Sequence, residues 1–169
     1  MKKYNFLYTL AFIKRGDDIL MLNRNKQPWQ GMWNGVGGKL KNNEDPLDSV
    51  IREIKEETGL SFLKSEIKFR GIVTWNGFND NLNNAFNQNG LYLYFVELSK
   101  NIALKTPLKT KEGILDWKKV DFLNDKDNLG VPYNIPYFID NVINSNTLYQ
   151  YDCLFEGNYL IDLKTKELK

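Results

Sequence analysis

The sequence predicts an α+β protein that folds as one domain. Its 169 residues are enough to bury a single hydrophobic core without disulfide bonds or structural metals. Short aromatic and aliphatic runs bounded by turn residues predict strands, and one central segment has apolar side chains at helical spacing. No repeat, linker or heptad pattern separates these elements, so we expect residues 1–169 to form one domain.

Two apolar runs near the start of the chain predict a β-hairpin. The first covers residues 6–13 and the second covers residues 19–22. Residues 15–18, Arg-Gly-Asp-Asp, lie between them and have the composition of a turn. The following segment, residues 27–39, contains four glycines and predicts a loop.

A helix is predicted directly after this loop. Asp45 is a favourable N-cap, Pro46 suits the first helical position, and Gly59 suits a left-handed C-terminal cap. The apolar side chains recur with the period of one helix face, which predicts a stripe that packs on the core. They are Leu47, Val50, Ile51 and Ile54.

The rest of the chain predicts further strands and a second helix. Strands are expected at residues 67–75, 91–98 and 114–120, a helix at 134–143, and a final hairpin within 153–163. Residues 76–90 contain seven asparagines and predict an exposed loop insertion.

Composition excludes several classes of function. A net charge of +2 is too small to indicate a nucleic-acid polymer as partner, and no apolar run is long enough for a membrane span. The single cysteine, Cys153, excludes an internal disulfide and fits a cytoplasmic protein. The chain has no histidine, so a Ser-His-Asp hydrolase and a histidine-ligated zinc site are excluded.

The predicted helix gathers carboxylates on the side away from its apolar stripe. Glu53, Glu56 and Glu57 are spaced to share one face. At a separation of about 5 Å, neighbouring carboxylates repel by about 3 kcal/mol at an effective dielectric of about 20, which favours a bound cation. All-oxygen ligands favour Mg²⁺ or Mn²⁺, and Mg²⁺ in turn indicates a phosphorylated substrate.

Residues around these carboxylates complete the pattern. Arg52 can reach Glu56 or Glu44 and orient the carboxylates, and Gly37-Gly38 lets the backbone approach a metal and phosphates closely. Glutamates alone would also suit a solvated acidic helix face. Their combination with Gly38, Glu44, Arg52 and Gly59 favours a metal site.

The spacing of these residues resembles the Nudix box, G-x5-E-x7-R-E-U-x-E-E-x-G-U, from Gly38 to Leu60. Seven fixed letters match a random window only about once in 10^8 to 10^9 tries. The resemblance implies an α/β/α sandwich around a mixed sheet, and hydrolysis of nucleoside diphosphates linked to another group. It also implies metal ligands: the Gly37 carbonyl and the carboxylates of Glu53, Glu56 and Glu57. Glu53 is the foremost candidate to help deprotonate the attacking water.

Other segments resemble the MutT-like oxidised-purine nucleoside triphosphatases. They are residues 7–10, residues 33–39, Glu112 placed five residues before Trp117, and residues 155–159. The resemblance implies that Glu112 is a further metal ligand, that Thr9 and Asn34 face the purine, and that Arg24 and Lys39 lie near the phosphates. Asn34 would also suit a turn and Thr9 an ordinary strand position.

One departure from that subgroup concerns the base. Its human-type members have a paired-aspartate motif where this chain has residues 127–133, Asp-Asn-Leu-Gly-Val-Pro-Tyr. Asn128 and Tyr133 are therefore candidates for part of the role in base recognition.

The sequence thus predicts a Mg²⁺-dependent enzyme, as monomer or homodimer, that converts a small-molecule nucleoside triphosphate to monophosphate and pyrophosphate. An oxidised purine nucleotide such as 8-oxo-dGTP is the candidate substrate. The alternatives are hydrolysis of another nucleoside diphosphate derivative, of NDP-sugar or ADP-ribose type, and a non-catalytic nucleotide sensor. Trp75 stands where ADP-ribose-type members usually have proline, and sensors usually lose box carboxylates, none of which is lost here.

Overall fold

The structure is a computed structural model that describes residues 4–76 and 87–169. Within these residues, nine strands form one sheet in the order β6-β7-β2-β1-β5-β4-β8-β9, with β3 beside β2. The strands are β1 (Phe6–Arg15), β2 (Asp18–Arg24), β3 (Trp33–Asn34), β4 (Ile67–Trp75), β5 (Asn87–Glu97), β6 (Leu108–Lys109), β7 (Gly113–Lys119), β8 (Tyr149–Glu156) and β9 (Tyr159–Glu167). The helices are α1 (Pro46–Thr58), the short 3-10 helix η1 (Lys64–Glu66), α2 (Val120–Asn124) and α3 (Ile135–Asn144).

The sheet is mixed, as predicted. Strand β1 runs parallel to β5 and β4 runs parallel to β8, while the other pairs are antiparallel. The predicted hairpin is formed by β1 and β2, with Arg15 paired to Asp18. The predicted C-terminal hairpin is formed by β8 and β9 and is longer than predicted at both ends.

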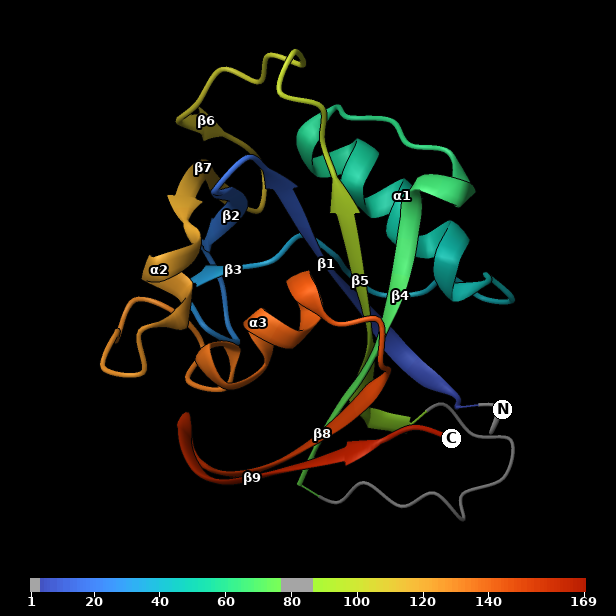
Figure 1. Ribbon diagram of the computed structural model, residues 1–169, viewed down its shortest axis with the longest axis vertical. Coiled ribbons are helices and arrows are strands. Elements are labelled where there is room, and N and C mark those ends of the chain that lie inside the picture. Colours follow the sequence, from blue (N-terminus) through green and yellow to red (C-terminus); the bar gives the residue numbers. More distant parts are fainter. Residues whose placement is uncertain (1–3, 77–86) are drawn as a thin grey trace.

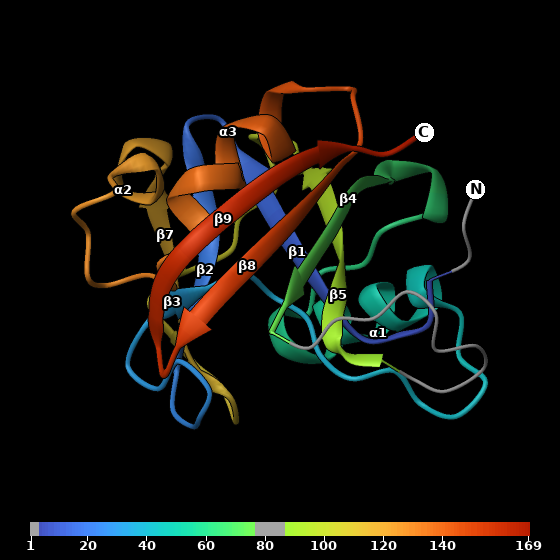
Figure 2. The ribbon, with the colours of Figure 1, turned by 90° about the horizontal axis from the view of Figure 1, so that it is seen from below.

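Helices cover both faces of the sheet. Val50 and Ile54 of α1 are buried in a cluster on one face, with residues of β1, β2 and β5. Phe138, Ile139 and Val142 of α3 are buried in a second cluster on the other face, which α2 joins. Figures 1 and 2 show α1 on one side of the strands and α2 and α3 on the other. The α/β/α arrangement is therefore confirmed.

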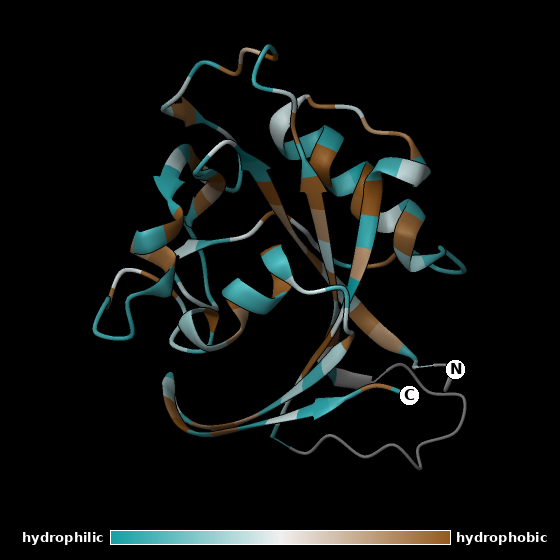
Figure 3. Cartoon of the chain, viewed as in Figure 1, coloured by the Kyte–Doolittle hydropathy of each residue, from teal (hydrophilic) through white to brown (hydrophobic). Residues whose placement is uncertain are grey.

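The distribution of hydropathy follows these layers. In Figure 3 the central strand β5 and much of β1 and β4 are hydrophobic, whereas the ribbons of helices α1 and α3 alternate between hydrophilic and hydrophobic residues. No helix in the described part of the chain is long and apolar enough to cross a membrane.

The predicted loop over residues 27–39 is more ordered than its composition indicates. Trp33 and Asn34 form β3 beside β2. Farther on, Ala11 and Val36 exchange backbone hydrogen bonds of 2.7 and 3.0 Å, and the Thr9 amide donates to the Gly38 carbonyl at 2.9 Å. The segment is held by neighbouring strands, and glycine content does not report such pairing.

Two other predictions need correction. The predicted insertion over residues 76–90 ends earlier, because β5 begins at Asn87 and pairs there with Phe6 of β1. Residues 77–86 lie outside the described part, so the loop itself stays a prediction. The short elements β6 and α2 were not predicted; β6 has only two residues and is defined by its pairing with β7.

Candidate functional site

Helix α1 carries Arg52 and the three glutamates that are predicted metal ligands, and its ends are those that the sequence predicts. The Asp45 side chain accepts a hydrogen bond of 2.9 Å from the Leu47 amide, and Gly59 closes the helix at φ 76°. The buried side chains Val50 and Ile54 fix the rotation of the helix on the sheet. This rotation directs the opposite side of the helix, with its glutamates, toward the glycine-rich loop.

Arg52 is the centre of the ionic network on this helix. Its Nε and Nη2 atoms donate to the two carboxylate oxygens of Glu44 at 2.7 and 2.8 Å. The hydrogen bonds from Arg52 lower the pKa of Glu44 to about 2, and the pair raises the pKa of Arg52. Glu44 also accepts from the Lys41 amide at 2.8 Å, so the pair joins the loop to the helix.

The same guanidinium group contacts the metal-ligand candidates. Its Nη1 atom donates to Glu53 at 2.6 Å and to Glu56 at 3.2 Å, and Nη2 donates to the Lys39 carbonyl at 3.2 Å. Arg52 therefore partly neutralises the carboxylates and fixes Glu53 beside the loop. It is placed to orient these groups, because one guanidinium group bonds to Glu44, Glu53 and Glu56 at once.

Gly37 and Gly38 bring the loop backbone against the helix and β1. A Cβ atom at Gly38 would lie 2.5 Å from Cδ of Glu53, and one at Gly37 would lie 2.2 Å from the Thr9 carbonyl oxygen. A side chain at either position would displace its neighbour. The Glu53 carboxylate thus lies directly against the Gly38 backbone.

Glu57 is the most perturbed carboxyl group of the site. Burial, together with the charges of Glu53 and Glu112, raises its pKa to about 8, and the Gly37 amide and Arg24 oppose this effect. Its Oε2 atom is buried and has no hydrogen-bond partner among the described residues. A buried carboxylate oxygen without a donor is suited to a cation.

These features fit a hard divalent cation. The donors are carboxylate and backbone oxygens, and the orphaned oxygen of Glu57 lies beside the glycine loop. In the part of the chain that the structure describes, however, no three acidic side chains already converge as a cation cage. Three of the candidate carboxylates, Glu53, Glu56 and Glu112, are instead engaged by basic side chains.

Glu112 illustrates this engagement. It lies in the loop between β6 and β7, and its Oε2 and Oε1 atoms are 2.7 and 3.0 Å from Nζ of Lys26. The charge of Glu112 contributes to the raised pKa of Glu57, which associates this loop with α1. Sequence reasoning missed Lys26, since nothing in the local sequence pairs it with a residue 86 positions away.

The two residues predicted to contact phosphates, Arg24 and Lys39, lie on different segments beside the carboxylates. Arg24, at the end of β2, donates from Nε to the Pro28 carbonyl at 2.7 Å, and its charge acts on Glu57. Lys39 is exposed on the loop beside Arg52. The structure therefore brings Arg24 and Lys39 to the border of the carboxylate cluster.

The predicted base contacts are mostly engaged within the protein. Asn34 accepts from the Gly35 amide at 2.8 Å. Asn128 donates to the Phe122 carbonyl at 2.7 Å and accepts from the Gly130 amide at 2.8 Å, which holds it within its own loop. Thr9 is buried in β1, and its Oγ1 has no partner among residues 4–76 and 87–169.

An aromatic cluster borders the loop that follows Arg24. Trp29 packs edge-on against Tyr133 and Phe155, at centroid distances of 6.3 and 5.5 Å, and Tyr133 stacks on Tyr159 at 5.8 Å. The resemblance of residues 155–159 pointed to this hairpin. Trp29 carried no such signal.

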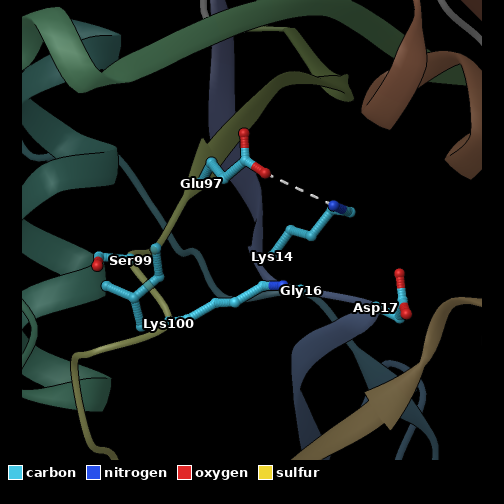
Figure 4. Close-up of a pocket in the computed structure, with 7 residues that line it drawn as sticks. Lys14, Gly16, Asp17, Glu97, Ser99 and Lys100 are labelled. Atoms are coloured by element: carbon cyan, nitrogen blue, oxygen red, sulfur yellow. Dashed lines mark ion pairs between the residues drawn. The ribbon is translucent and has the colours of Figure 1, made fainter.

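A surface hollow lies elsewhere, at the hairpin end of β1. Lys14, Asp17, Glu97 and Lys100 are among its lining residues, and Lys14 pairs with Glu97 at 3.6 Å (Figure 4). Because it contains no residue of α1 or of the glycine loop, it is separate from the carboxylate cluster.

The structure is thus an α/β/α protein in which a carboxylate-rich helix lies against a glycine-rich loop. Residues 7–129 match the family model of the NUDIX domain, and the chain belongs to this family. Nudix hydrolases generally use divalent metals such as Mg²⁺ or Mn²⁺, and the complete set of box residues supports hydrolase activity here.

Two curated relatives illustrate the similarity in sequence. The uncharacterized Nudix hydrolase YvcI of Bacillus subtilis is 28% identical over 121 residues, which cover 72% of this chain and 68% of that protein. The oxidized purine nucleoside triphosphate hydrolase of Mus musculus is 38% identical over 55 residues, which cover 32% of this chain and 35% of that protein. The second match therefore spans about a third of either protein.

Two crystal structures illustrate the similarity in fold. The Mutator MutT protein from Bacillus halodurans has a TM-score of 0.69 at 22% identity, over 94% of this chain and 96% of that one. The NUDIX domain of Shewanella oneidensis NrtR, complexed with ADP ribose, has a TM-score of 0.61 at 17% identity, over 83% and 88%. At these identities the similarity concerns the fold alone.

Proposed function

We propose that this protein is a divalent-cation-dependent pyrophosphohydrolase that converts a nucleoside triphosphate and water to the nucleoside monophosphate and pyrophosphate. The observation that carries the proposal is the arrangement around Arg52 and the glycine loop. It keeps Glu53 ordered against Gly38, and a buried oxygen of Glu57 nearby has no hydrogen-bond partner among residues 4–76 and 87–169. Such an arrangement suits binding of a cation together with phosphate oxygens.

The residues that would hold the cation are Glu53, Glu56, Glu57 and Glu112, with the Gly37 carbonyl. A bound cation would supply charge neutralisation on the phosphates and a lower pKa for water. Arg52 and Glu44 keep Glu53 in place, and Glu53 accepts the proton of the attacking water. The water oxygen forms a bond to the α-phosphorus in line with the anhydride bond, which breaks and releases pyrophosphate.

Oxidised purine nucleotides such as 8-oxo-dGTP are the substrate class that we propose. The side-chain amide of Asn34 can donate to and accept from a purine edge, and Arg24 and Lys39 supply positive charge for a triphosphate. The 38% identity with the mouse oxidized purine nucleoside triphosphate hydrolase over 55 residues supports this choice. A cytoplasmic location would suit such a role, and the single buried cysteine is compatible with it.

Hydrolysis of ADP-ribose is the second candidate. It is favoured by the fold similarity to an NrtR domain that was crystallised with ADP ribose. Trp75 at the end of β4, where ADP-ribose-type members usually have proline, speaks against it.

A substrate panel tests both candidates. The protein is incubated with Mg²⁺ or Mn²⁺ and 8-oxo-dGTP, dGTP or ADP-ribose, and the products are separated by anion-exchange chromatography. We expect 8-oxo-dGMP and pyrophosphate, formed at least tenfold more efficiently than dGMP from dGTP. Equal, negligible turnover of both triphosphates would refute the proposal. AMP released from ADP-ribose would then support the second candidate, and nucleotide binding without hydrolysis would support a sensor.

A further inference from the structure

Lys26 connects two loops that meet at the candidate metal site. Its ammonium group lies within 3.0 Å of both carboxylate oxygens of Glu112. The neighbouring Asn25 adds two contacts, from its amide to the Glu112 carbonyl at 3.0 Å and from its side chain to the Lys111 carbonyl at 2.8 Å. The backbone contacts fix the loops together, so the ion pair between the side chains can open without separating them.

Lys26 pairs with Glu112, which is one of the carboxylates proposed to hold the cation. The charge of Glu112 acts on Glu57, so the two groups belong to one electrostatic cluster. In the described residues no three acidic side chains converge, and two of the candidate ligands are ion-paired, Glu112 with Lys26 and Glu53 with Arg52. Of these two cations, Arg52 is held by several hydrogen bonds and its side chain is 20% exposed, whereas the Lys26 side chain is 60% exposed.

We propose that Lys26, which pairs with Glu112, is a positioning residue whose ammonium group passes to the phosphates of the substrate when Glu112 binds a divalent cation. This inference rests on the proposed function. A divalent ion attracts a carboxylate more strongly than an ammonium group does, and the flexible stem of lysine lets the group move by several ångströms. Lys26 follows Arg24 by two residues, so the released ammonium group would remain near Arg24, beside which we propose that the triphosphate binds.

The exchange has a consequence for metal binding in the absence of nucleotide. The cation must displace Lys26, so the ion pair weakens metal affinity by its own strength. Exposed pairs of this kind correspond to a factor of about two to five in an equilibrium constant. Lys26→Met keeps the apolar stem and removes the ammonium group, and should therefore bind the metal more tightly than the unsubstituted protein.

For nucleotide binding, the expected effect of removing the Lys26 ammonium group has the opposite sign. Once Lys26 is released it would pair with phosphate oxygens, so Lys26→Met should weaken binding of the nucleotide. Lys26 thus couples occupation of Glu112 by metal to binding of the polyphosphate.

Isothermal titration with Mn²⁺ alone tests the first consequence on four proteins: unsubstituted, Lys26→Met, Lys26→Arg and Lys111→Met. We expect Lys26→Met to lower the Kd for Mn²⁺ about two- to fivefold, and Lys26→Arg to restore the original value. Lys111→Met is the matched control, since it removes an equal charge next to Glu112 from an exposed side chain. In a Glu112→Gln background, Lys26→Met should have no effect. Thermal unfolding checks that each variant is folded.

Titration with an α,β-imido analogue of 8-oxo-dGTP in saturating Mn²⁺ tests the second consequence, and we expect Lys26→Met to raise its Kd at least threefold. An unchanged or higher Kd for Mn²⁺ in Lys26→Met, or an equal gain in Lys111→Met, would overturn the inference. So would an analogue Kd that does not rise. Failure of the unsubstituted protein to bind Mn²⁺ would overturn the inference and the proposed function together, whereas these other outcomes leave hydrolysis untouched.

Discussion

Glu57 has the carboxyl group whose pKa is raised most among the candidate ligands. Its buried Oε2 atom has no hydrogen-bond donor among the described residues, and burial raises its pKa to about 8. Glu57→Gln keeps the shape of the side chain and removes its ability to ionise and bind a cation. We expect kcat to fall by about 10^2- to 10^4-fold, because the site loses a carboxylate that neutralises the cation. Steady-state hydrolysis in Mg²⁺ measures this effect.

A carboxylate on the same helix provides the control. Asp48 is exposed and pairs with Lys64 at 2.5 Å, away from the site. Asp48→Asn should leave kcat within about twofold of the original value. Retention of full activity by Glu57→Gln would exclude the catalytic role of this carboxylate.

Glu44 makes a pH-dependent contribution to stability. Its pKa is about 2 in the folded protein and 4.5 in an unfolded chain, so above pH 4.5 its ionised form stabilises the fold. Between pH 4.5 and 2 the unfolded chain binds more protons than the folded protein, and this contribution is lost as the pH falls. We expect Glu44→Gln to lower the free energy of unfolding by about 1–3 kcal/mol at pH 7.

Urea denaturation at a series of pH values tests this. The difference between Glu44→Gln and the unsubstituted protein should narrow as the pH falls below 4.5. A difference that stays constant from pH 7 to pH 3 would show that the Arg52–Glu44 pair does not act through the charge of Glu44.

The contrast between Arg52 and Lys26 shows which contacts a sequence reveals. The reach of Arg52 to Glu56 could be predicted, because helix geometry brings residues four apart onto one face. Its pairing with Glu44, which precedes the helix, was predicted only as a possible contact. The contact between Lys26 and Glu112 could not, because it depends on which two loops the sheet order brings together. The base contacts proposed for Asn34 and Asn128 also stay predictions, because the side-chain amides of both residues already bond within their own loops.

At the scale of elements, the bounds were predicted correctly where residues within the segment itself mark its two ends. Helix α1 has its N-cap at Asp45 and its left-handed cap at Gly59, and β4 has the predicted bounds. It failed for β3 and β6, each of two residues, because such strands exist only through pairing with a neighbour. Strand β5 likewise begins before its apolar run, where its backbone pairs with β1.

The two glycines before α1 should respond differently to alanine. In Gly38→Ala the new Cβ meets the end of the Glu53 side chain, which can rotate away. We expect the Tm to change by less than about 2 °C and kcat to fall at least tenfold, since Glu53 is displaced.

In Gly37→Ala the new Cβ meets the backbone carbonyl of Thr9, which cannot move without disturbing β1. Here the free energy of unfolding should fall by about 1–3 kcal/mol. Urea denaturation and kinetics on both variants separate the effects. Similar losses of stability in the two variants would contradict this assignment of roles.

At the scale of the whole molecule, the core extends past the region that matches the family. The NUDIX match ends at residue 129, yet α3 covers one face of the sheet and β8 pairs with β4 beyond it. The alternation of buried and exposed residues in β8 places Tyr151 and Cys153 in that core and Leu154 outside it. The C-terminal hairpin is therefore part of the cooperative unit that supports the site.

Tyr151→Ala tests this role of the hairpin. Tyr151 is 0% exposed, and its ring packs on Phe138 of α3 at 5.3 Å. Removal of a buried aromatic side chain leaves a cavity, so we expect the free energy of unfolding to fall by about 3–5 kcal/mol. Leu154→Ala, on the same strand at 50% exposure, should change it by less than about 1 kcal/mol. If urea denaturation gave Tyr151→Ala the small effect of Leu154→Ala, the hairpin would be peripheral. The part of the sheet that packs on α1, formed by β1, β2, β4 and β5, would then be stable without the C-terminal hairpin.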